Sequence, residues 1–203
     1  GDADILIGTP HAGRTGSESM VGIAVNTLAL RTPVSLASTF EETFAAVRDA
    51  DLDAFEHSAL PFDTIVGELR PERHPARHPI VQIMVSVSAS PPLQIDMGGR
   101  SIRAVDMPVE KTAFDLVVAV RGRADGGADV AVTFSRDLFL PSTARDIAAA
   151  VVDTVDRATD APELSLASLT GPSRAPSDTE YLDTFLARVA AEAPHHCAIV
   201  AAE

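Results

Sequence analysis

Short apolar runs and alternating side chains predict several β-strands along the chain. Residues 4–8 form a β-branched run that ends at Gly8-Thr9-Pro10, and residues 25–31 alternate so that one face is apolar. Residues 80–88 alternate most clearly, because valine or isoleucine occupies every odd position from 81 to 87. Further strands are predicted at residues 101–106, 114–121 and 129–135, with a hairpin turn at residues 124–127.

A period of three to four residues predicts helices between these strands. Ser38 with Glu41 three residues later is a capping-box pattern, so a helix is expected over residues 39–57. Its apolar side would carry Phe40, Phe44 and Val47. Pro61 suits the first turn of a second helix, whose apolar stripe begins at Phe62.

Prolines set the limits of the remaining helical segments. A helix is excluded between residues 71 and 80 by Pro71, Pro75 and Pro79. Pro141 opens a long helix to residue 158. The side chains expected to point inward from it are Ile147, Val151 and Val155.

Strands mixed with amphipathic helices indicate an α/β fold with a mixed sheet.

The chain changes character at Thr170. Residues 171–180 have the composition of a linker, and residues 181–189 form a short amphipathic pattern before an apolar run at residues 198–201. One helix and one strand cannot bury a core unaided. We therefore expect three parts, which are residues 1–170, a linker at 171–180, and residues 181–203 as the start of another domain.

Composition and charge narrow the function classes. The 203 residues are 46% hydrophobic, which excludes a wholly disordered chain, and the formal charge of −13 disfavours binding to nucleic acid. The single cysteine excludes an internal disulfide, and no apolar run is long enough to span a membrane. The acidic start is the wrong charge order for a secretory signal, so a soluble, cytoplasmic protein is expected.

Two short patterns are possible binding sites that the residues argue against. Residues 8–15 nearly match a phosphate-binding loop, but Arg14 replaces its lysine and Pro10 lacks a backbone N–H, so a structural turn is expected. His74 and His78 have the spacing of a helical metal pair, but the prolines exclude that helix, so no metal is expected.

No catalytic motif is present in the chain. His195-His196 does not continue as H-H-x-x-x-D-G, because Val200 and Ala201 stand where Asp and Gly are needed. A G-x-S-x-G nucleophile elbow is also absent.

Four stretches, in order and with matching spacing, resemble the condensation domains of nonribosomal peptide synthetases. Residues 21–31 (VGIAVNTLALR) are similar to their V-N-T motif through Gly22, Asn26 and Thr27. Residues 57–66 resemble their H-x-x-x-P-F-E-x-x-V motif through His57, Pro61 and Phe62. Residues 73–82 resemble their R-D-x-S-R-x-P-x-x-Q motif, through Arg73, Arg77, Pro79 and Gln82, and residues 7–14 resemble I-G-x-P-x-A-G-R. The tail resembles the first helix and strand of an adenylation domain.

The family pattern is breached at a few positions. Ala24 stands where Phe is usual, Ser58-Ala59 where Gln-Asp is usual, and His74 and Ala76 where Asp and Ser are usual. These departures leave open a relaxed or degenerate domain.

The resemblance implies the carboxy-terminal lobe of a two-lobed, chloramphenicol-acetyltransferase-like fold. In this family the H-H-x-x-x-D-G motif lies in the amino-terminal lobe, and the chain begins after it. The implied activity is amide formation in a tunnel between the lobes, which is open to the phosphopantetheine arms of donor and acceptor carrier proteins. The implied partners are the amino-terminal lobe, the donor and acceptor peptidyl carrier proteins and the adjacent adenylation domain, with no nucleic acid, no membrane and no cofactor held by the chain itself.

Site residues follow from alternation and from the motifs. The mildly polar face with Gln82, Met84, Ser86 and Ser88 is the expected tunnel wall, with ordinary cross-strand packing as the alternative. Asn26 would either face the tunnel or, as we expect, bond loop backbone. His57 is expected to cap or brace a loop, and Arg77 to tie loops together. No residue is assigned a catalytic role.

Carrier docking would need local basic charge, because the chain and the carrier proteins of such assembly lines are both acidic. Arg70, Arg73 and Arg77 form the densest basic cluster, and Arg100 with Arg103 forms a second. Two other functions stay open, which are a non-catalytic carrier-docking module and a nucleotide-binding protein based on residues 8–15.

Overall fold

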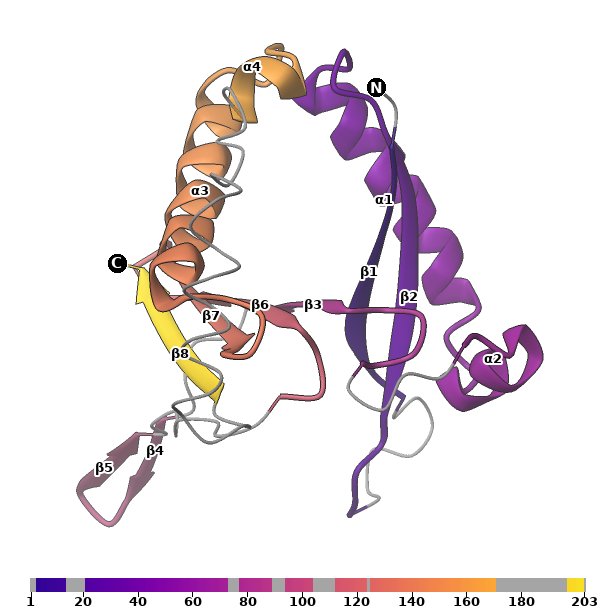
Figure 1. The fold of residues 1–203 in the computed structure, drawn as a ribbon. Coiled ribbons are helices and arrows are strands. Elements are labelled where there is room, and N and C mark those ends of the chain that lie inside the picture. The colour runs from indigo at the N-terminus through magenta and orange to yellow at the C-terminus, as the bar shows by residue number, and fades with distance from the viewer. Residues whose placement is uncertain are drawn as a thin grey trace.

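A computed structural model describes residues 3–13, 21–72, 77–88, 94–103, 112–123, 125–170 and 197–202. A six-stranded mixed sheet has the strand order β2-β1-β3-β6-β7-β8, and β4 and β5 form a separate two-stranded sheet (Figure 1). The strands are β1 (Ala3–Ala12), β2 (Val25–Val34), β3 (Ile83–Ser88), β4 (Gln94–Met97), β5 (Arg100–Arg103), β6 (Leu116–Gly122), β7 (Ala128–Ser135) and β8 (Cys197–Ala202). The helices are α1 (Phe40–Glu56), α2 (Phe62–Leu69), α3 (Pro141–Asp160) and α4 (Leu166–Thr170).

Strand register gives the six-stranded sheet two chemically different faces. Parallel pairing places Val85 beside Val118, and antiparallel pairing places Val118 beside Val132. We call this side, which also carries Ile5 and Ile7 of β1, the apolar face. The opposite side carries Gly8, Met84, Ser86, Ala119 and Ala131, and we call it the polar face.

Both long helices lie on the apolar face. The main core packs α3 through Ala144 and Ala148 against side chains of the apolar face, namely Leu116, Val118, Val130, Val132 and Phe134. The ring of Phe55 on α1 lies 5.5 Å from that of His11, which shares its face of β1 with Ile7. The two helices cover opposite ends of the sheet (Figure 1).

Strand pairing in the sheet is shortest between β1 and β3. These strands share one register pair, Gly8 with Met84, whereas β1 and β2 pair over their whole length. A Cβ atom on Gly8 would lie 3.1 Å from Val81 Cγ2 and 3.3 Å from Met84 Cε. Glycine is therefore favoured here by the close approach of two side chains rather than by backbone conformation.

Backbone hydrogen bonds at the start of α1 join it to the segment that follows α3. Phe40 N–H donates to the Leu164 carbonyl at 3.0 Å, and Leu166 N–H donates to the Ser38 carbonyl at 2.9 Å. Arg157 of α3 donates to two carbonyls of α4, those of Ser168 and Leu169. These bonds tie α4 to both long helices.

Most expected elements are present, with shifted ends. The strand expected at residues 4–8 extends to Ala12 because β2 pairs with it throughout, so residues 8–12 form neither a phosphate-binding loop nor a turn. Thr39 rather than Ser38 caps α1, with Glu42 completing the capping box. The strand expected from residue 80 begins at Ile83, and β4 and α4 were not anticipated.

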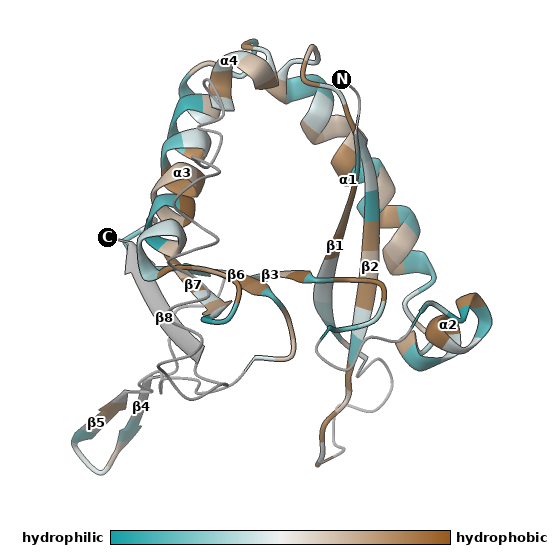
Figure 2. Cartoon of the chain, in the orientation of Figure 1, coloured by the Kyte–Doolittle hydropathy of each residue, from teal (hydrophilic) through white to brown (hydrophobic). Residues whose placement is uncertain are grey.

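One packing expectation is wrong. Val155 lies on the same stripe of α3 as buried Ala148 and Ala158, but it is 54% exposed. The residues that α3 buries near its start are alanines, which let the helix approach the sheet closely. Hydropathy colouring shows apolar residues on the sides of α1 and α3 that face each other (Figure 2).

The tail is described only at β8, which pairs antiparallel with β7. The linker at 171–180 and the helix expected at 181–189 lie outside the described residues, and their assignment to a following domain stays a prediction. No helix in the described part of the chain is long and apolar enough to cross a membrane.

Candidate functional site

Asn26 ties β2 to the loop between α1 and α2. Its Nδ2 donates to the carbonyls of Ser58 at 3.1 Å and Leu60 at 2.8 Å. Its Oδ1 accepts from the backbone N–H of Thr27 and of Phe62, each at 3.0 Å. The expectation that Asn26 bonds loop backbone is confirmed, and these four bonds hold the side chain against the loop.

The side chain of Phe62, whose backbone N–H binds Asn26, lies at one end of a row of three packed rings. It is 8% exposed, and its ring centroid lies 5.3 Å from that of His78. The His78 ring also lies 4.4 Å from Phe114, so the imidazole sits between two aromatic rings. Its Nδ1 lies 3.0 Å from the Pro79 carbonyl. Packing between rings gives His78 a structural environment, while His74, four residues earlier, lies outside the described residues.

Arg77 and Gln82 connect the segment around His78 to Asp115, which precedes β6. Arg77 Nη2 lies 3.3 Å from Oδ2 of Asp115, a largely buried carboxylate just ahead of β6, which confirms that Arg77 ties loops together. Gln82 Nε2 donates to the His78 carbonyl at 3.3 Å, and the Gln82 carbonyl accepts from Asp115 N–H at 2.9 Å. The amide of Gln82 is thus bonded within the loop.

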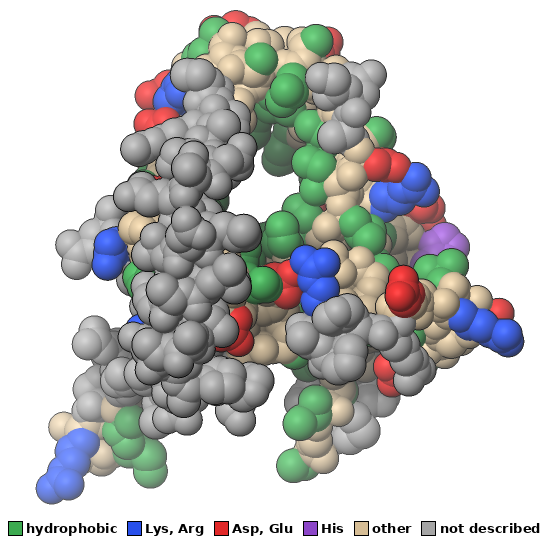
Figure 3. Space-filling model, viewed as in Figure 1, with side chains coloured by type: hydrophobic (Ala, Val, Ile, Leu, Met, Phe, Trp, Pro, Cys, Tyr) green, Lys and Arg blue, Asp and Glu red, His purple; other side chains and the backbone are tan. Residues whose placement is uncertain are grey.

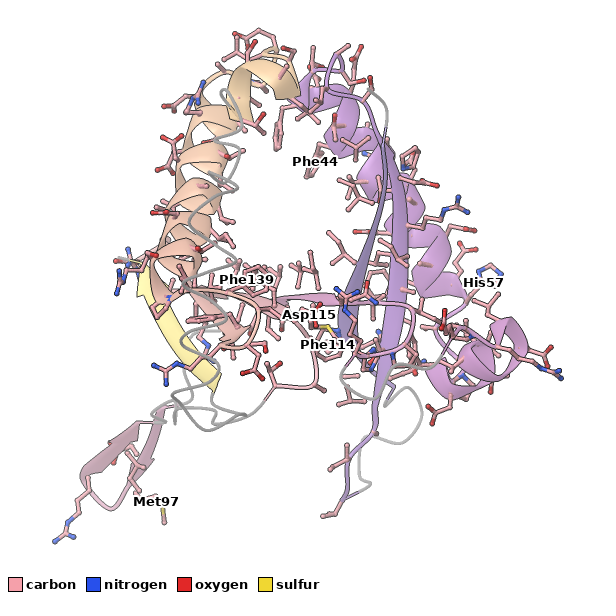
Figure 4. The ribbon with its side chains drawn as sticks, in the orientation of Figure 1. Phe44, His57, Met97, Phe114, Asp115 and Phe139 are labelled. Carbon is pink, nitrogen blue, oxygen red and sulfur yellow. The ribbon has the colours of Figure 1, made fainter. Side chains whose placement is uncertain are left out.

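Three motifs that are far apart in the sequence therefore meet at one place. Asn26 bonds the backbone of Phe62, the Phe62 ring packs on His78, and Arg77 pairs with Asp115. Figure 4 shows Phe114 and Asp115 at the base of the sheet, close to β1 and β3. Asp115 and Phe114 were not singled out from the sequence. They follow Lys111 in a short stretch whose only signal was the start of a strand.

His57 ends α1 and lies apart from this junction (Figure 4). Its exposed ring is positioned by Nδ1, which donates to the Asp53 carbonyl at 2.9 Å. This bond raises the pKa of His57 above its ordinary value, and the negative charges of Asp53 and Glu56 raise it further. His57 is the C-cap residue of α1, and its expected role as a cap or brace stays a prediction.

The other motif residues shape the backbone. Gly22 has a φ of +156°, a value that side-chain-bearing residues rarely adopt, and Pro61 is the N-cap residue of α2. Pro79 supplies the carbonyl that faces His78 Nδ1. Thr27 lies in β2 opposite Pro10. Arg73 lies outside the described residues.

The polar face of β3 offers fewer open side chains than its sequence pattern indicated. Met84 is buried against Gly8, and Gln82 precedes β3 and bonds the loop. Ser86 is half-buried beside Ala119, and Ser88 is exposed beside Arg121. Since α1 and α3 both pack on the apolar face, neither of these helices covers Ser86 or Ser88.

A cavity of about 860 Å³ opens between α2 and the segment that leads to β3. Apolar walls come from Phe62 and Val66, and polar groups come from Asp63, Arg77 and Gln82. Among the described residues, no three histidine, cysteine, aspartate or glutamate side chains lie close enough together to hold a metal ion. The junction can therefore hold the wall of this cavity in place and present the polar groups of Asp63, Arg77 and Gln82 to a bound molecule.

Known proteins resemble this chain in sequence and in fold. A family profile described as "Condensation domain" matches residues 1–179. Surfactin synthase subunit 1 of Bacillus subtilis (strain 168) is 37% identical over 146 residues, which are 71% of this chain and 4% of that protein. The X-domain from teicoplanin biosynthesis superposes with a TM-score of 0.70 at 24% identity, over 81% of this chain and 38% of that one. The first condensation domain of the CDA synthetase superposes with a TM-score of 0.61 at 20% identity, over 80% of this chain and 36% of that one.

These likenesses confirm the expected fold, a chloramphenicol-acetyltransferase-like arrangement of a mixed sheet with packed helices. The chain spans less than two fifths of the length of the solved chains and a few per cent of the synthetase subunit.

Proposed function

Because the chain belongs to the condensation-domain family of nonribosomal peptide synthetases, we propose that it is the carboxy-terminal lobe of such a domain. In this role it serves amide formation between a donor acyl thioester and an acceptor aminoacyl thioester, both held on carrier proteins. The observation that carries the proposal is the convergence of three condensation-domain motifs at the junction of Asn26, Phe62 and Arg77.

The reaction joins two carrier-bound substrates. The acceptor amine attacks the donor thioester carbonyl, so that a carbon–nitrogen bond forms and the carbon–sulfur bond breaks. The donor phosphopantetheine leaves as a thiolate, and the proton lost by the amine ends on that sulfur. The phosphopantetheine arms belong to the carrier proteins, and this chain holds no cofactor in the proposal.

The general base for this step comes from elsewhere in the proposal. The sequence contains no H-H-x-x-x-D-G motif. His57 bonds the end of α1, and His78 is packed between Phe62 and Phe114. His78 is therefore enclosed between rings, and His57 lies apart from the junction (Figure 4). We therefore propose that the amino-terminal lobe supplies the base and that this chain is inactive alone.

This lobe would supply one wall of the tunnel through its polar face. Ser86 and Ser88 support this role, because they lie on the sheet face opposite α1 and α3. Ala119, the register partner of Ser86, has a small side chain that would not obstruct an extended thioester arm on this face. Gln82, Met84 and Asn26 would contribute indirectly, since their side chains are bonded or buried at the junction that shapes this wall.

Docking of the acidic carrier protein would use the cluster of Arg70, Arg73 and Arg77. Arg70 ends α2 in a left-handed conformation and is exposed. Arg77 keeps most of its side chain exposed although one nitrogen pairs with Asp115. Basic and acidic side chains lie next to one another at several places on the visible surface (Figure 3), so docking would depend on local charge rather than on the net charge.

The wall proposal is tested by added bulk in the complete synthetase. Ser86→Phe should lower kcat/KM for amide formation by on the order of tenfold or more, because misplaced reacting groups lose the benefit of positioning. Ser142→Phe adds the same bulk at an exposed position on α3 and should leave the rate unchanged. Equal rates for both variants at equal melting temperatures would contradict the assignment of Ser86 to the tunnel.

A further inference from the structure

Ile80 has a strained backbone conformation. Its φ of +66° lies in a region that residues branched at Cβ rarely adopt, and the Val81 N–H donates to the Pro79 carbonyl at 2.7 Å. A bond between residues two apart closes a γ-turn centred on Ile80, and the form with positive φ is the rarer and more strained of the two. Among the described residues other than glycine, Arg70 also has a positive φ, but it ends α2, where this conformation is common.

The turn places Val81 on the side of the sheet opposite to the one that alternation predicts. In a continuous strand, Val81 would share the apolar face with Ile83 and Val85. Instead, a Cβ atom on Gly8 would lie 3.1 Å from Val81 Cγ2 and 3.3 Å from Met84 Cε. Both side chains therefore meet β1 on the polar face, and Val81 is 0% exposed there.

Contacts on both sides of the turn hold Ile80 in this conformation. Ahead of it, the His78 ring lies between two aromatic rings, and its Nδ1 faces the Pro79 carbonyl. After it, the Gln82 carbonyl accepts from the Asp115 N–H at 2.9 Å. Ile80 itself is half-buried and lines the cavity beside α2. Strained residues persist where their surroundings fix them in this way, and they occur preferentially at functional sites.

The alignment of β3 with β1 depends on this contact. The two strands share a single register pair, Gly8 with Met84, so few backbone bonds align them. Packing of Val81 and Met84 on Gly8 therefore sets the place of β3 along β1. Ser86 lies on the same face two residues after Met84, so its position follows that of Met84.

We propose that Ile80 is a positioning residue for amide formation, because its strained turn holds Val81 and Met84 on Gly8 and thereby sets the place of Ser86 in the tunnel wall. This role rests on the proposed function, since it requires that Ser86 faces the reacting thioesters. Isoleucine fills the cavity wall and keeps the turn strained, whereas glycine would adopt the turn freely and leave that part of the wall empty.

Two polar substitutions test the strain. Asparagine adopts positive φ more readily than most residues, whereas threonine is branched at Cβ like isoleucine. In the 203-residue chain, Ile80→Asn should therefore melt about 2–6 °C above Ile80→Thr. An equal or higher melting temperature for Ile80→Thr would overturn the proposal, because the turn would then carry no strain.

Thiol accessibility tests what the turn holds in place. In a Cys197→Ser background, Val81→Cys should react with iodoacetamide at least about tenfold faster with Ile80→Pro than with Ile80→Asn, because proline has φ fixed at about −65° and excludes the turn. Leu69→Cys, at a position that is 65% exposed on α2, should react equally fast with either substitution. Equally slow reaction of Val81→Cys in both would show that the turn is not needed to hold Val81.

Amide formation by the complete condensation domain tests the positioning role. At saturating carrier proteins, Ile80→Pro should lower kcat by on the order of tenfold or more relative to Ile80→Asn. Ala158→Gly, at a buried position on α3, lowers stability without touching β3 and should keep the wild-type kcat. Equal kcat values for the two Ile80 variants would contradict the positioning role. A wild-type domain that makes no amide would contradict the proposed function instead, and the thiol rates would still decide whether the turn holds Val81.

Discussion

The side-chain oxygen of Asn26 accepts a hydrogen bond from the backbone N–H of Phe62, 36 residues further along the chain, at 3.0 Å. Pro61, the N-cap residue of α2, offers no side-chain cap. Asn26 thus satisfies one of the free N–H groups at the start of α2 from a neighbouring strand. The V-N-T motif and the P-F motif are joined by this bond, which gives Asn26 a structural role that a tunnel position alone would not require.

Removal of this amide should destabilise the protein. Asn26→Ala breaks four hydrogen bonds to backbone groups, and we expect a loss of about 2–4 kcal/mol in the free energy of unfolding measured by urea titration. Asn26→Asp retains the two bonds that Oδ1 accepts but places a carboxylate against the carbonyls of Ser58 and Leu60. It should be nearly as destabilising, and a wild-type value for Asn26→Asp would show that the two donated bonds contribute little.

Phe62 should be the most sensitive position on α2. Phe62→Ala removes a ring that is 8% exposed and packs on His78, so we expect a loss of about 3–5 kcal/mol in the free energy of unfolding. Leu69→Ala on the same helix, at an exposed position, should cost less than about 1 kcal/mol. An unchanged melting temperature for Phe62→Ala would mean that α2 presents another side to the junction.

The contact between β1 and β3 can be tested with two glycines. Gly8→Ala places a Cβ atom 3.1 Å from Val81 and 3.3 Å from Met84, and should destabilise by about 1–3 kcal/mol through overpacking. Gly67→Ala on α2 meets nothing within 4 Å, so it should be neutral or stabilising by about 0.5–1 kcal/mol. Adding Met84→Ala to Gly8→Ala should cost less than the two single changes summed. Additive losses would place the clash elsewhere.

His57 makes a small pH-dependent contribution to stability. Its pKa is raised in the folded protein, chiefly by the bond to the Asp53 carbonyl. The stabilisation is therefore present below the unfolded pKa of about 6.5 and is lost as the pH rises through the higher folded value. The melting temperature of the wild type should exceed that of His57→Ala by more at about pH 5.5 than at about pH 8. A difference that grows with pH would contradict this account.

Carrier docking should depend on the arginines that follow α2 in the sequence. Arg70→Glu or Arg73→Glu should weaken binding of the acidic carrier protein to the complete domain by on the order of tenfold at low salt, and less at high salt. Arg48→Glu, on exposed α1, removes the same charge from another surface and is the control. Equal binding by all three variants, measured by calorimetry, would exclude this docking surface.

Local patterns in the sequence were sufficient to predict most of the helices and strands. The proline at the start of α2 and the alternation in β3 each act within a few residues, so they can be read without a structure. The capping box of α1 was predicted one residue too early, because Ser38 with Glu41 and Thr39 with Glu42 fit the same pattern.

The partners of the motif residues could not be read, since Asp115 and Phe114 meet Arg77 and His78 only through the pairing of β3 with β6. Exposure of Val155 was likewise unpredictable, because a helical stripe shows which side faces inward and not whether another element covers it.

Amide formation by the purified chain is the most direct measurement of the central proposal. Donor and acceptor carrier proteins, each loaded with its thioester, would be incubated with the 203-residue chain, with the amino-terminal lobe, and with both, and the product would be followed by mass spectrometry. We expect product only when both parts are present, and its loss when the second histidine of the partner's H-H-x-x-x-D-G motif is changed to alanine. Product from the 203-residue chain alone, above the uncatalysed rate, would contradict its assignment as a lobe that lacks the catalytic base.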